Sequence, residues 1–135
     1  MLLTKECDYS VRIIRTLSDG SKKTVEAISE AEHIPSKFAY KILKKLENAG
    51  FLKSHRGRSG GYQMAQSLDK ITLYDIVTAV DNKLLITECL QGGAACPNNT
   101  EGNPCIFHKE FKSIQEILNE SLSKKSMQEI FGEEK

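Results

Sequence analysis

The feature that most constrains this chain is a segment from Cys89 to His108, CLQGGAACPNNTEGNPCIFH, which holds three of the four cysteines. The residues between the cysteines are mostly glycine, asparagine, proline and alanine, which form turns rather than a packed core. Because such a segment cannot fold around apolar surface of its own, we expect thiolates to organise it by closing on a metal ion or a metal cluster. The thiolates available in this segment are those of Cys89, Cys96 and Cys105, and a histidine, His108, follows the last of them by three residues.

The composition is that of a soluble globular protein: 135 residues, of which 39% are hydrophobic and 27% are charged. No apolar run is long enough to span a bilayer, and the start, MLLTKECDYSVR, gains charges too early for a secretory signal. We therefore expect a cytoplasmic protein with no membrane partner. In a reducing compartment, four cysteines favour metal binding or redox chemistry over structural disulfides.

Basic residues are concentrated in the first half of the chain. Residues 1–70 contain 13 Lys or Arg against 8 Asp or Glu, whereas residues 71–135 contain 6 against 10. Within residues 37–58 the imbalance is greatest, because Glu47 is the one acidic residue among seven basic ones. A basic stripe on a small domain indicates phosphate binding, and an ordinary solvated helix face is the alternative.

The basic half is expected to begin with three helices. Apolar residues spaced by three and four positions predict a first helix over about 4–19, with Cys7 on its buried stripe. A second helix over 24–32 and a third over 37–48 are separated by a tight connection before Pro35, since the residue before proline avoids helical backbone. Two short helices joined in this way, the second of them basic, form a helix-turn-helix.

The third helix is the candidate recognition helix. Ser36 can cap its amino end, and Phe38, Ile42 and Leu46 form its apolar face. The opposite face is basic, so we expect it to enter the major groove of double-stranded DNA. The candidate contacts on this helix are Ser36, Lys37, Tyr40, Lys41 and Lys44.

A glycine-rich hairpin follows the recognition helix. Residues 51–55 and 62–65 are expected to form two short strands, with RGRSGG at 56–61 as the turn. Arginine at a narrow tip suits the negative potential of the minor groove, and glycine allows close backbone approach. We therefore interpret the hairpin as a DNA-contacting wing rather than an ordinary surface turn, with candidate contacts Arg56, Arg58, Ser59 and Gly60.

Helices are also expected in the second half. Thr72 can cap a helix to about Val80, and Ser126-x-x-Glu129 is a capping box for a short terminal helix. From Cys105 onward an apolar stripe recurs at helical spacing, comprising Phe107, Phe111, Ile114, Leu118 and Leu122. A small winged domain has little room to bury this long helix. We expect it to pack against a second copy of the chain, with burial in the same chain as the alternative.

These patterns predict a mainly α fold with a small β-hairpin wing. A winged helix-turn-helix domain would occupy residues 1–82, and a cysteine-rich, cluster-binding loop would occupy 83–108. A dimerisation helix and a short carboxyl-terminal helix would occupy 105–135.

Four tracts resemble the Rrf family of winged-helix regulators, of the IscR and NsrR type. They are LTKECDYSVR, IPSKFAYKILKKLENAGFLKSHRGRSGGY, ITLYDIV and the downstream cysteine triplet, in the family's order. The resemblance implies a homodimeric transcription factor in which an iron–sulfur cluster controls DNA binding. By motif, Cys89, Cys96 and Cys105 would be cluster ligands, with gaps of six and eight residues that are longer than usual in the family.

Two signatures within the family give different fourth ligands. His108 matches the Cys-x-x-His ending of the 2Fe–2S branch. Asp8 instead matches the acidic residue that reaches a 4Fe–4S cluster from the other subunit in the nitric-oxide-sensing branch. Glu6 and Cys7 are further candidates nearby. We favour His108, and with it a 2Fe–2S cluster, because His108 follows Cys105 by only three residues.

The sequence therefore predicts a sequence-specific, DNA-binding transcriptional regulator whose affinity is controlled by an iron–sulfur cluster that senses cluster status, redox state or nitric oxide. A cluster-free thiol switch or a zinc-containing regulator of the same fold is the alternative. A small iron–sulfur electron carrier is a rival from another class, but it would not need the basic helix and the RGRSGG tip. No nucleophile, base and orienting residue are grouped by motif, so we expect no enzyme.

Overall fold

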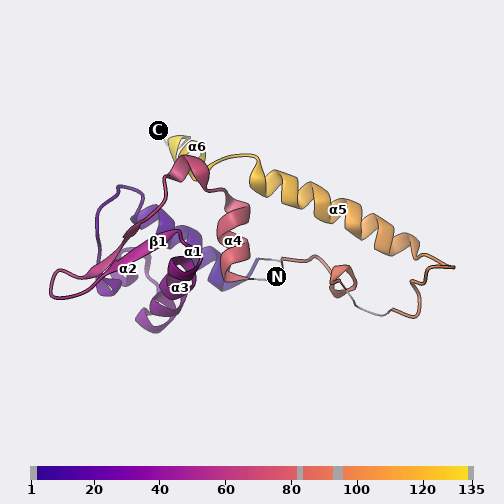
Figure 1. The fold of residues 1–135 in the computed structure, drawn as a ribbon, viewed down its shortest axis with the longest axis horizontal. Helices are drawn as coiled ribbons and strands as arrows, with labels where there is room; N and C mark the ends of the chain where they lie inside the picture. The colour runs from indigo at the N-terminus through magenta and orange to yellow at the C-terminus, as the bar shows by residue number, and fades with distance from the viewer. Residues whose placement is uncertain (1–2, 82–83, 93–95, 134–135) are drawn as a thin grey trace.

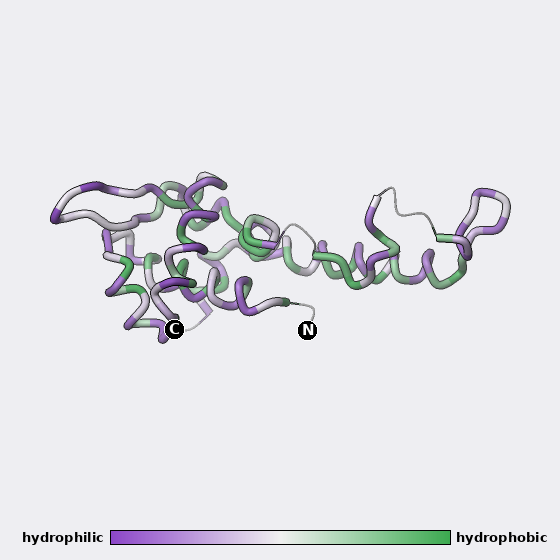
Figure 2. The backbone as a smooth tube through the Cα atoms, turned by 90° about the horizontal axis from the view of Figure 1, so that it is seen from below, coloured by the Kyte–Doolittle hydropathy of each residue, from purple (hydrophilic) through white to green (hydrophobic). Residues whose placement is uncertain are grey.

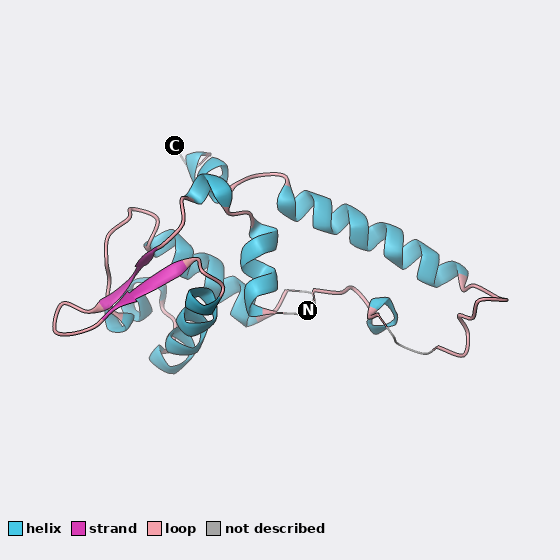
Figure 3. Ribbon diagram, in the orientation of Figure 1, coloured by secondary structure: helices cyan, strands magenta, loops and turns pink. Residues whose placement is uncertain are grey.

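A computed structural model describes residues 3–81, 84–92 and 96–133. The predicted boundary between residues 82 and 83 lies outside the described residues. The described part is mainly helical, with a two-stranded antiparallel sheet (Figure 1, Figure 3). In chain order its elements are α1 (Lys5–Thr16), α2 (Val25–Glu32), α3 (Ser36–Asn48), β1 (Leu52–His55), β2 (Gly61–Met64), a 3₁₀ turn η1 (Leu68–Lys70), α4 (Leu73–Val80), a 3₁₀ turn η2 (Glu88–Leu90), α5 (Ile106–Ser123) and α6 (Met127–Gly132).

Helices α1 to α4 pack around one hydrophobic core, which together with the hairpin forms the head of the molecule (Figure 1). Cys7 is 2% exposed within this core, which confirms its assignment to the buried stripe of α1. The fully buried large aliphatic side chains of the head are Ile13, Ile14, Leu17, Ile28, Ile42, Leu43, Leu46, Ile71 and Ile76. Their burial fixes the angle at which α3 presents its outer face.

Threonine hydroxyls cap three of the described helices. Thr4, Thr24 and Thr72 each accept a hydrogen bond from the backbone amide three residues further on, which satisfies a free donor of the first turn. The first helix ends at Thr16 rather than near residue 19. The chain leaves α1 through a turn closed by the Gly20 amide on the Leu17 carbonyl, with Gly20 at a φ of 80°.

The turn between α2 and α3 differs in detail from the sequence expectation. Pro35, not Ser36, holds the N-cap position, and no side chain caps the helix there. The predicted cap is wrong because α3 begins one residue earlier, so the Ser36 hydroxyl lies 3.2 Å from the Ser29 hydroxyl instead. Phe38 is also not part of the apolar face. It is 48% exposed and lies at the edge of α3, its ring 6.5 Å from that of Tyr9.

The predicted hairpin is confirmed as β1 and β2, which pair antiparallel with Leu52 opposite Met64. Backbone hydrogen bonds of 2.8 and 2.9 Å join Tyr62 to Lys23, so the hairpin is tied to the segment that leads into α2. At Gly61 a side chain would overlap the Lys23 carbonyl, and φ is 148°. Glycine at this position therefore lets the wing lie directly against the helix-turn-helix.

Helix α5 extends away from the head (Figure 1), and hydrophobic positions recur along it (Figure 2). Its exposed apolar side chains, between 39% and 75% accessible, are Ile106, Phe107, Phe111, Ile114 and Ile117. The carboxyl end differs, because Leu122 packs against the core of the head. Beyond α5 the capping box of Ser126 and Glu129 is confirmed, and Met127 is buried. Of the apolar stripe predicted on this helix, the part near Leu122 is therefore buried within the same chain, and the part toward its amino end is exposed.

Candidate nucleic-acid interface and cysteine loop

The outer face of α3 is basic and open to solvent. Lys37, Tyr40 and Lys41 are exposed, with Tyr40 at 52%. Lys44 is half-buried, and its ammonium group lies 5.7 Å from the centre of the Tyr40 ring. Ser36 is exposed at the amino end of the helix. The five candidate contacts of this helix therefore lie outside the hydrophobic core, on a surface that a DNA groove can reach.

One carboxylate of α1 reaches this helix. The Glu6 Oε1 atom accepts a hydrogen bond of 2.7 Å from Lys41 Nζ, and Oε2 accepts one of 2.7 Å from Lys45 Nζ. These two hydrogen bonds lower the pKa of Glu6 below its ordinary value. Sequence reasoning placed Glu6 only among the possible metal ligands. It missed the lysine pairing because the partners are 35 and 39 residues away.

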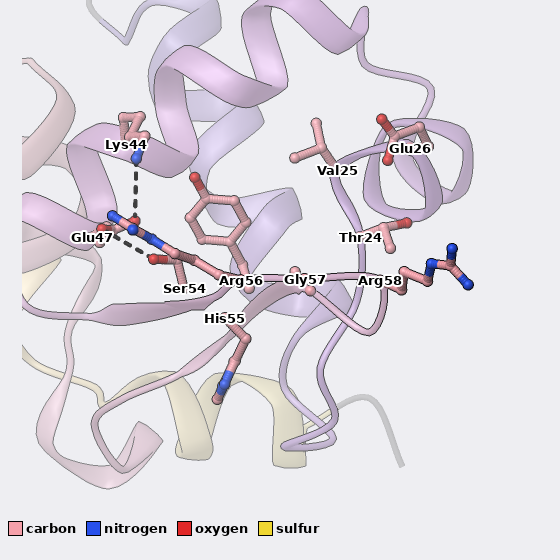
Figure 4. Close-up of a pocket in the computed structure, with 13 residues that line it drawn as sticks. Thr24, Val25, Glu26, Lys44, Glu47, Ser54, His55, Arg56, Gly57 and Arg58 are labelled. Atoms are coloured by element: carbon pink, nitrogen blue, oxygen red, sulfur yellow. Dashed lines mark hydrogen bonds and ion pairs between the residues drawn. The ribbon is translucent and has the colours of Figure 1, made fainter.

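A cavity of 430 Å³ lies between the wing, α3 and the start of α2 (Figure 4). Its lining includes Tyr62, which is buried, and burial raises the pKa of the Tyr62 hydroxyl. Arg56 extends back toward Glu47 of α3, whereas Arg58 extends outward from the tip of the wing. Ser54 donates to Glu47 at 3.3 Å. The wing and the recognition helix thus share one polar, partly basic hollow.

The tip of the wing is a tight turn. The Gly60 amide donates to the Gly57 carbonyl at 2.9 Å, and Gly57 has a φ of 95°. A Cβ on Gly60 would lie 2.6 Å from the His55 carbonyl oxygen and 2.7 Å from that of Gly57. Gly60 is therefore needed to close the turn that presents Arg58 and the exposed Ser59.

The three cysteines of the loop lie in three different local structures. Cys89 is in η2, Cys96 forms a β-bridge with Asn99, and Cys105 holds the N-cap position of α5. The Cys105 amide donates to Asn99 Oδ1 at 2.8 Å, which links the bridge to the start of the helix. None of the three forms a disulfide, and all are partly exposed, so a metal ion or an oxidant can reach their sulfur atoms.

Cys89 and His108 line one cavity of 460 Å³ beside α5. His108 Nδ1 is buried, and among the described residues it has no hydrogen-bond partner. Thiolate and imidazole bind both iron–sulfur clusters and zinc, so the chemistry of this pair fits such a group. Cys96 and Cys105 do not line the cavity. Within the described part of the chain, no three His, Cys, Asp or Glu residues are close enough to hold one metal ion.

The buried side chain of Gln115 positions the segment that leads to Cys89. Its Oε1 accepts a hydrogen bond of 2.9 Å from the Ile86 amide, and its Nε2 donates to the Leu84 carbonyl at 2.9 Å. Gln115 also lines the cavity of Cys89 and His108. This role could not be predicted from the sequence, because a glutamine on a helix is ordinarily a surface residue.

The alternative ligand Asp8 lies in the head rather than beside His108. Its carboxylate pairs with Arg12 of the same helix at 2.7 Å, and both side chains are well exposed. Asp8 lines a different cavity, of 420 Å³, whose walls include Val11 and Leu122. In a single chain, Asp8 and His108 are thus parts of separate sites.

Comparison with known proteins decides the family. The family model Rrf2, described as an iron-dependent transcriptional regulator, matches residues 3–133. The chain belongs to the Rrf2 family. It is therefore a DNA-binding transcriptional regulator and not an enzyme. The family match confirms the family inferred from the sequence, and the structural match confirms the fold class. No helix in the described residues of this Rrf2 protein is long and apolar enough to cross a membrane.

Relatives and solved structures agree with this assignment. A protein of Haemophilus influenzae named as an HTH-type transcriptional regulator is 32% identical over 127 residues, covering 89% of this chain and 82% of its own. Protein aau3 of Rhizobium meliloti is 32% identical over 122 residues, covering 87% and 79%. The T. potens IscR structure has a TM-score of 0.76 at 17% identity, covering 98% of this chain and 87% of its own. CymR, the global cysteine regulator of B. subtilis, has a TM-score of 0.74 at 18% identity, covering 94% and 93%.

Proposed function

We propose that this Rrf2 regulator binds operator DNA with an affinity set by an iron–sulfur cluster in its cysteine loop. Cys89, Cys96 and Cys105 would supply thiolates, and His108 the fourth ligand. The observation that carries the proposal is that His108 lines the same cavity as Cys89, and that its buried Nδ1 has no hydrogen-bond partner in the part of the chain that the structure describes. A buried polar atom without a partner is costly, so a bound group that engages this imidazole is favoured.

The coupling between loop and DNA would run through α5. When bound, an iron–sulfur cluster supplies a centre that oxidants and nitric oxide can alter. Cys105 is the N-cap residue of α5, and Gln115 of the same helix holds the backbone that leads to Cys89. A change in the conformation of the cysteine loop would therefore move the amino end of α5. A shift of α5 would change the spacing of two reading heads on paired half-sites.

A homodimer through α5 is the second part of the proposal. The exposed apolar side chains of this helix form a stripe that a second copy can cover, as in other helix pairs. Residues 105–135 would then be the dimerisation unit, residues 1–82 the DNA-binding domain and residues 83–108 the sensor loop.

The DNA contacts would come from α3 and the wing. Ser36, Lys37, Tyr40, Lys41 and Lys44 would meet the major groove, and Arg56, Arg58, Ser59 and Gly60 the backbone or minor groove beside it. The shared hollow between Lys44 and the wing supports one continuous interface (Figure 4).

The fourth ligand sets the expected cluster type. His108 corresponds to the favoured 2Fe–2S cluster, whereas Asp8 supplied by the second copy corresponds to a 4Fe–4S cluster. The Asp8–Arg12 ion pair lies on the exposed surface of α1, so a second copy could engage this carboxylate. His108→Ala and Asp8→Ala variants separate the two possibilities, because only the variant that removes a true ligand should change the absorption spectrum of the cluster.

The free thiols favour one second candidate. Cys89, Cys96 and Cys105 are unpaired and partly exposed, and the oxidised form of S. aureus CymR shares this fold with a TM-score of 0.72 at 17% identity, covering 94% of this chain and 93% of its own. A regulator in which two loop thiols form a disulfide on oxidation would use the same loop without iron. Zinc held by the same thiolates is a third, closely related arrangement.

The deciding experiment is purification without oxygen, followed by counts of iron, sulfide and zinc per chain and an absorption spectrum. We expect iron and sulfide in equal amounts with visible charge-transfer bands, and loss of both in Cys89→Ala, Cys96→Ala and Cys105→Ala. Cys7→Ala is the matched control, since Cys7 is buried in the head and should leave the iron content unchanged. Iron-free protein that holds one zinc, or that forms a loop disulfide with peroxide, would replace the cluster proposal by one of the other two.

A further inference from the structure

The carboxylate of Glu6 lies against the recognition helix from outside the helix-turn-helix. Glu6 is in the first turn of α1, and its two oxygens each receive a 2.7 Å hydrogen bond from a lysine of α3. The two lysines, Lys41 and Lys45, are one helical turn apart. One negative charge therefore binds two of the positive charges on the helix assigned to DNA reading.

The two lysines are held to different degrees. Lys45 is the less exposed, at 36%, and also donates to the Val80 carbonyl at the end of α4, at 3.1 Å. Lys45 thus joins three helices. Lys41 is 56% exposed, and Glu6 is its only ion-pair partner in the described part of the chain. Lys41 is therefore the lysine that can leave Glu6 for another anion without disturbing the head.

We propose that Glu6 is an internal competitor of the DNA phosphates for Lys41, and that it limits the affinity of this regulator for DNA. The proposal requires that α3 is the DNA-reading helix, but it does not require the cysteine loop or its cofactor. Lys41 stands on α3 next to Tyr40 and one turn from Lys37 and Lys44, all candidate DNA contacts. To reach a phosphate it must break its bond with Glu6.

The physical consequence is a smaller electrostatic contribution to DNA binding. Each lysine that neutralises a phosphate releases counterions and steepens the fall of affinity with salt, by a slope of about 0.9 per contact on B-form DNA. While Glu6 holds Lys41, that contact is missing or weakened. The Glu6 carboxylate, 26% exposed, also places a negative charge on the flank of the interface.

The test is Glu6→Gln, which removes the charge but keeps the size and hydrogen-bonding capacity of the side chain. We expect roughly three- to tenfold tighter binding at low salt, on specific and non-specific duplexes alike, and a salt slope that is steeper by about one. Lys41→Gln should weaken DNA binding less in the native background than in the Glu6→Gln background, where it should also abolish the gain. Asp69→Asn is the control, because it changes the net charge equally at an exposed site on η1.

Two results would overturn the proposal. One is a Glu6→Gln protein that binds DNA no more tightly, or more weakly, with an unchanged salt slope, since Glu6 would then only hold the helices together. The other is a Lys41→Gln variant that loses as much DNA affinity in the native protein as in the Glu6→Gln protein. Lys44→Gln tests the separate assumption that α3 is the DNA-reading helix. If Lys44→Gln leaves DNA binding unchanged, α3 does not read DNA and the proposed interface is wrong.

Discussion

Replacing Gln115 by leucine tests whether α5 positions the cysteine loop. The wild-type side chain is 7% exposed and satisfies two backbone groups, the Ile86 amide and the Leu84 carbonyl, at 2.9 Å each. Leucine has nearly the same volume but no polar atom, so both backbone groups lose their partner. A buried group left unpaired costs about 1–3 kcal/mol, and Ile86 is partly exposed, so water can replace part of the loss. We therefore expect a total destabilisation of about 2 kcal/mol.

The assay is urea denaturation at fixed protomer concentration, combined with hydrogen exchange of the Ile86 amide and iron content after anaerobic purification. Gln115→Leu should lower the free energy of unfolding, speed exchange at Ile86 and reduce retained iron. Gln128→Leu, the same substitution at an exposed position of α6, is the control. An unfolding free energy within about 0.5 kcal/mol of wild type, with protected Ile86, would refute the reasoning.

Three further predictions concern the head, the wing and the long helix. The Glu32 pKa lies below its ordinary value of 4.5, chiefly because Arg15 donates to its carboxylate, so its contribution to stability is present above pH 4.5 and is lost as pH falls further. Glu32→Gln should thus lower the free energy of unfolding by about 2 kcal/mol at neutral pH, and the difference from wild type should shrink in acid. A difference that does not vary with pH would show that the Arg15 pairing does not stabilise the head. Gly60→Ala should weaken DNA binding in an anisotropy assay and lower the thermal stability, because its Cβ would lie 2.6 Å from the His55 carbonyl oxygen and the backbone of the turn would have to shift. Phe107→Glu, at a position 65% exposed, should yield monomers in sedimentation, and a persisting dimer would exclude this part of α5 from the interface.

The fold could be predicted closely wherever the signal was local. Threonine caps, the capping box at Ser126 and apolar residues at helical spacing each determine structure within a few positions, so the helices and the hairpin were expected nearly where they lie. One of the two errors on α3 has a local cause and the other a tertiary cause. The backbone of Pro35 already suits the N-cap position, so α3 begins at Ser36. In the packed molecule Phe38 is 48% exposed, and the periodicity of a single helix does not report how that helix packs against its neighbours.

The candidate site was predicted by residue type but not by contact. The cysteines and His108 were named from the loop and its family resemblance, and among the described residues Cys89 and His108 line one cavity that Cys96 and Cys105 do not line. The roles of Gln115 and Glu6 could not be predicted from the sequence. Gln115 and its backbone partners are 29 and 31 residues apart, and Glu6 and Lys41 are 35 apart, so only the folded chain makes them neighbours.

The most direct test of the central claim is the affinity of one operator duplex for the same protein with and without its loop cofactor, measured by fluorescence anisotropy without oxygen. The account predicts that anaerobically purified protein and Cys96→Ala protein differ in affinity at least tenfold, about 1.4 kcal/mol, while Cys7→Ala matches the wild type. Equal affinities for iron-loaded protein and for the Cys96→Ala variant would contradict it.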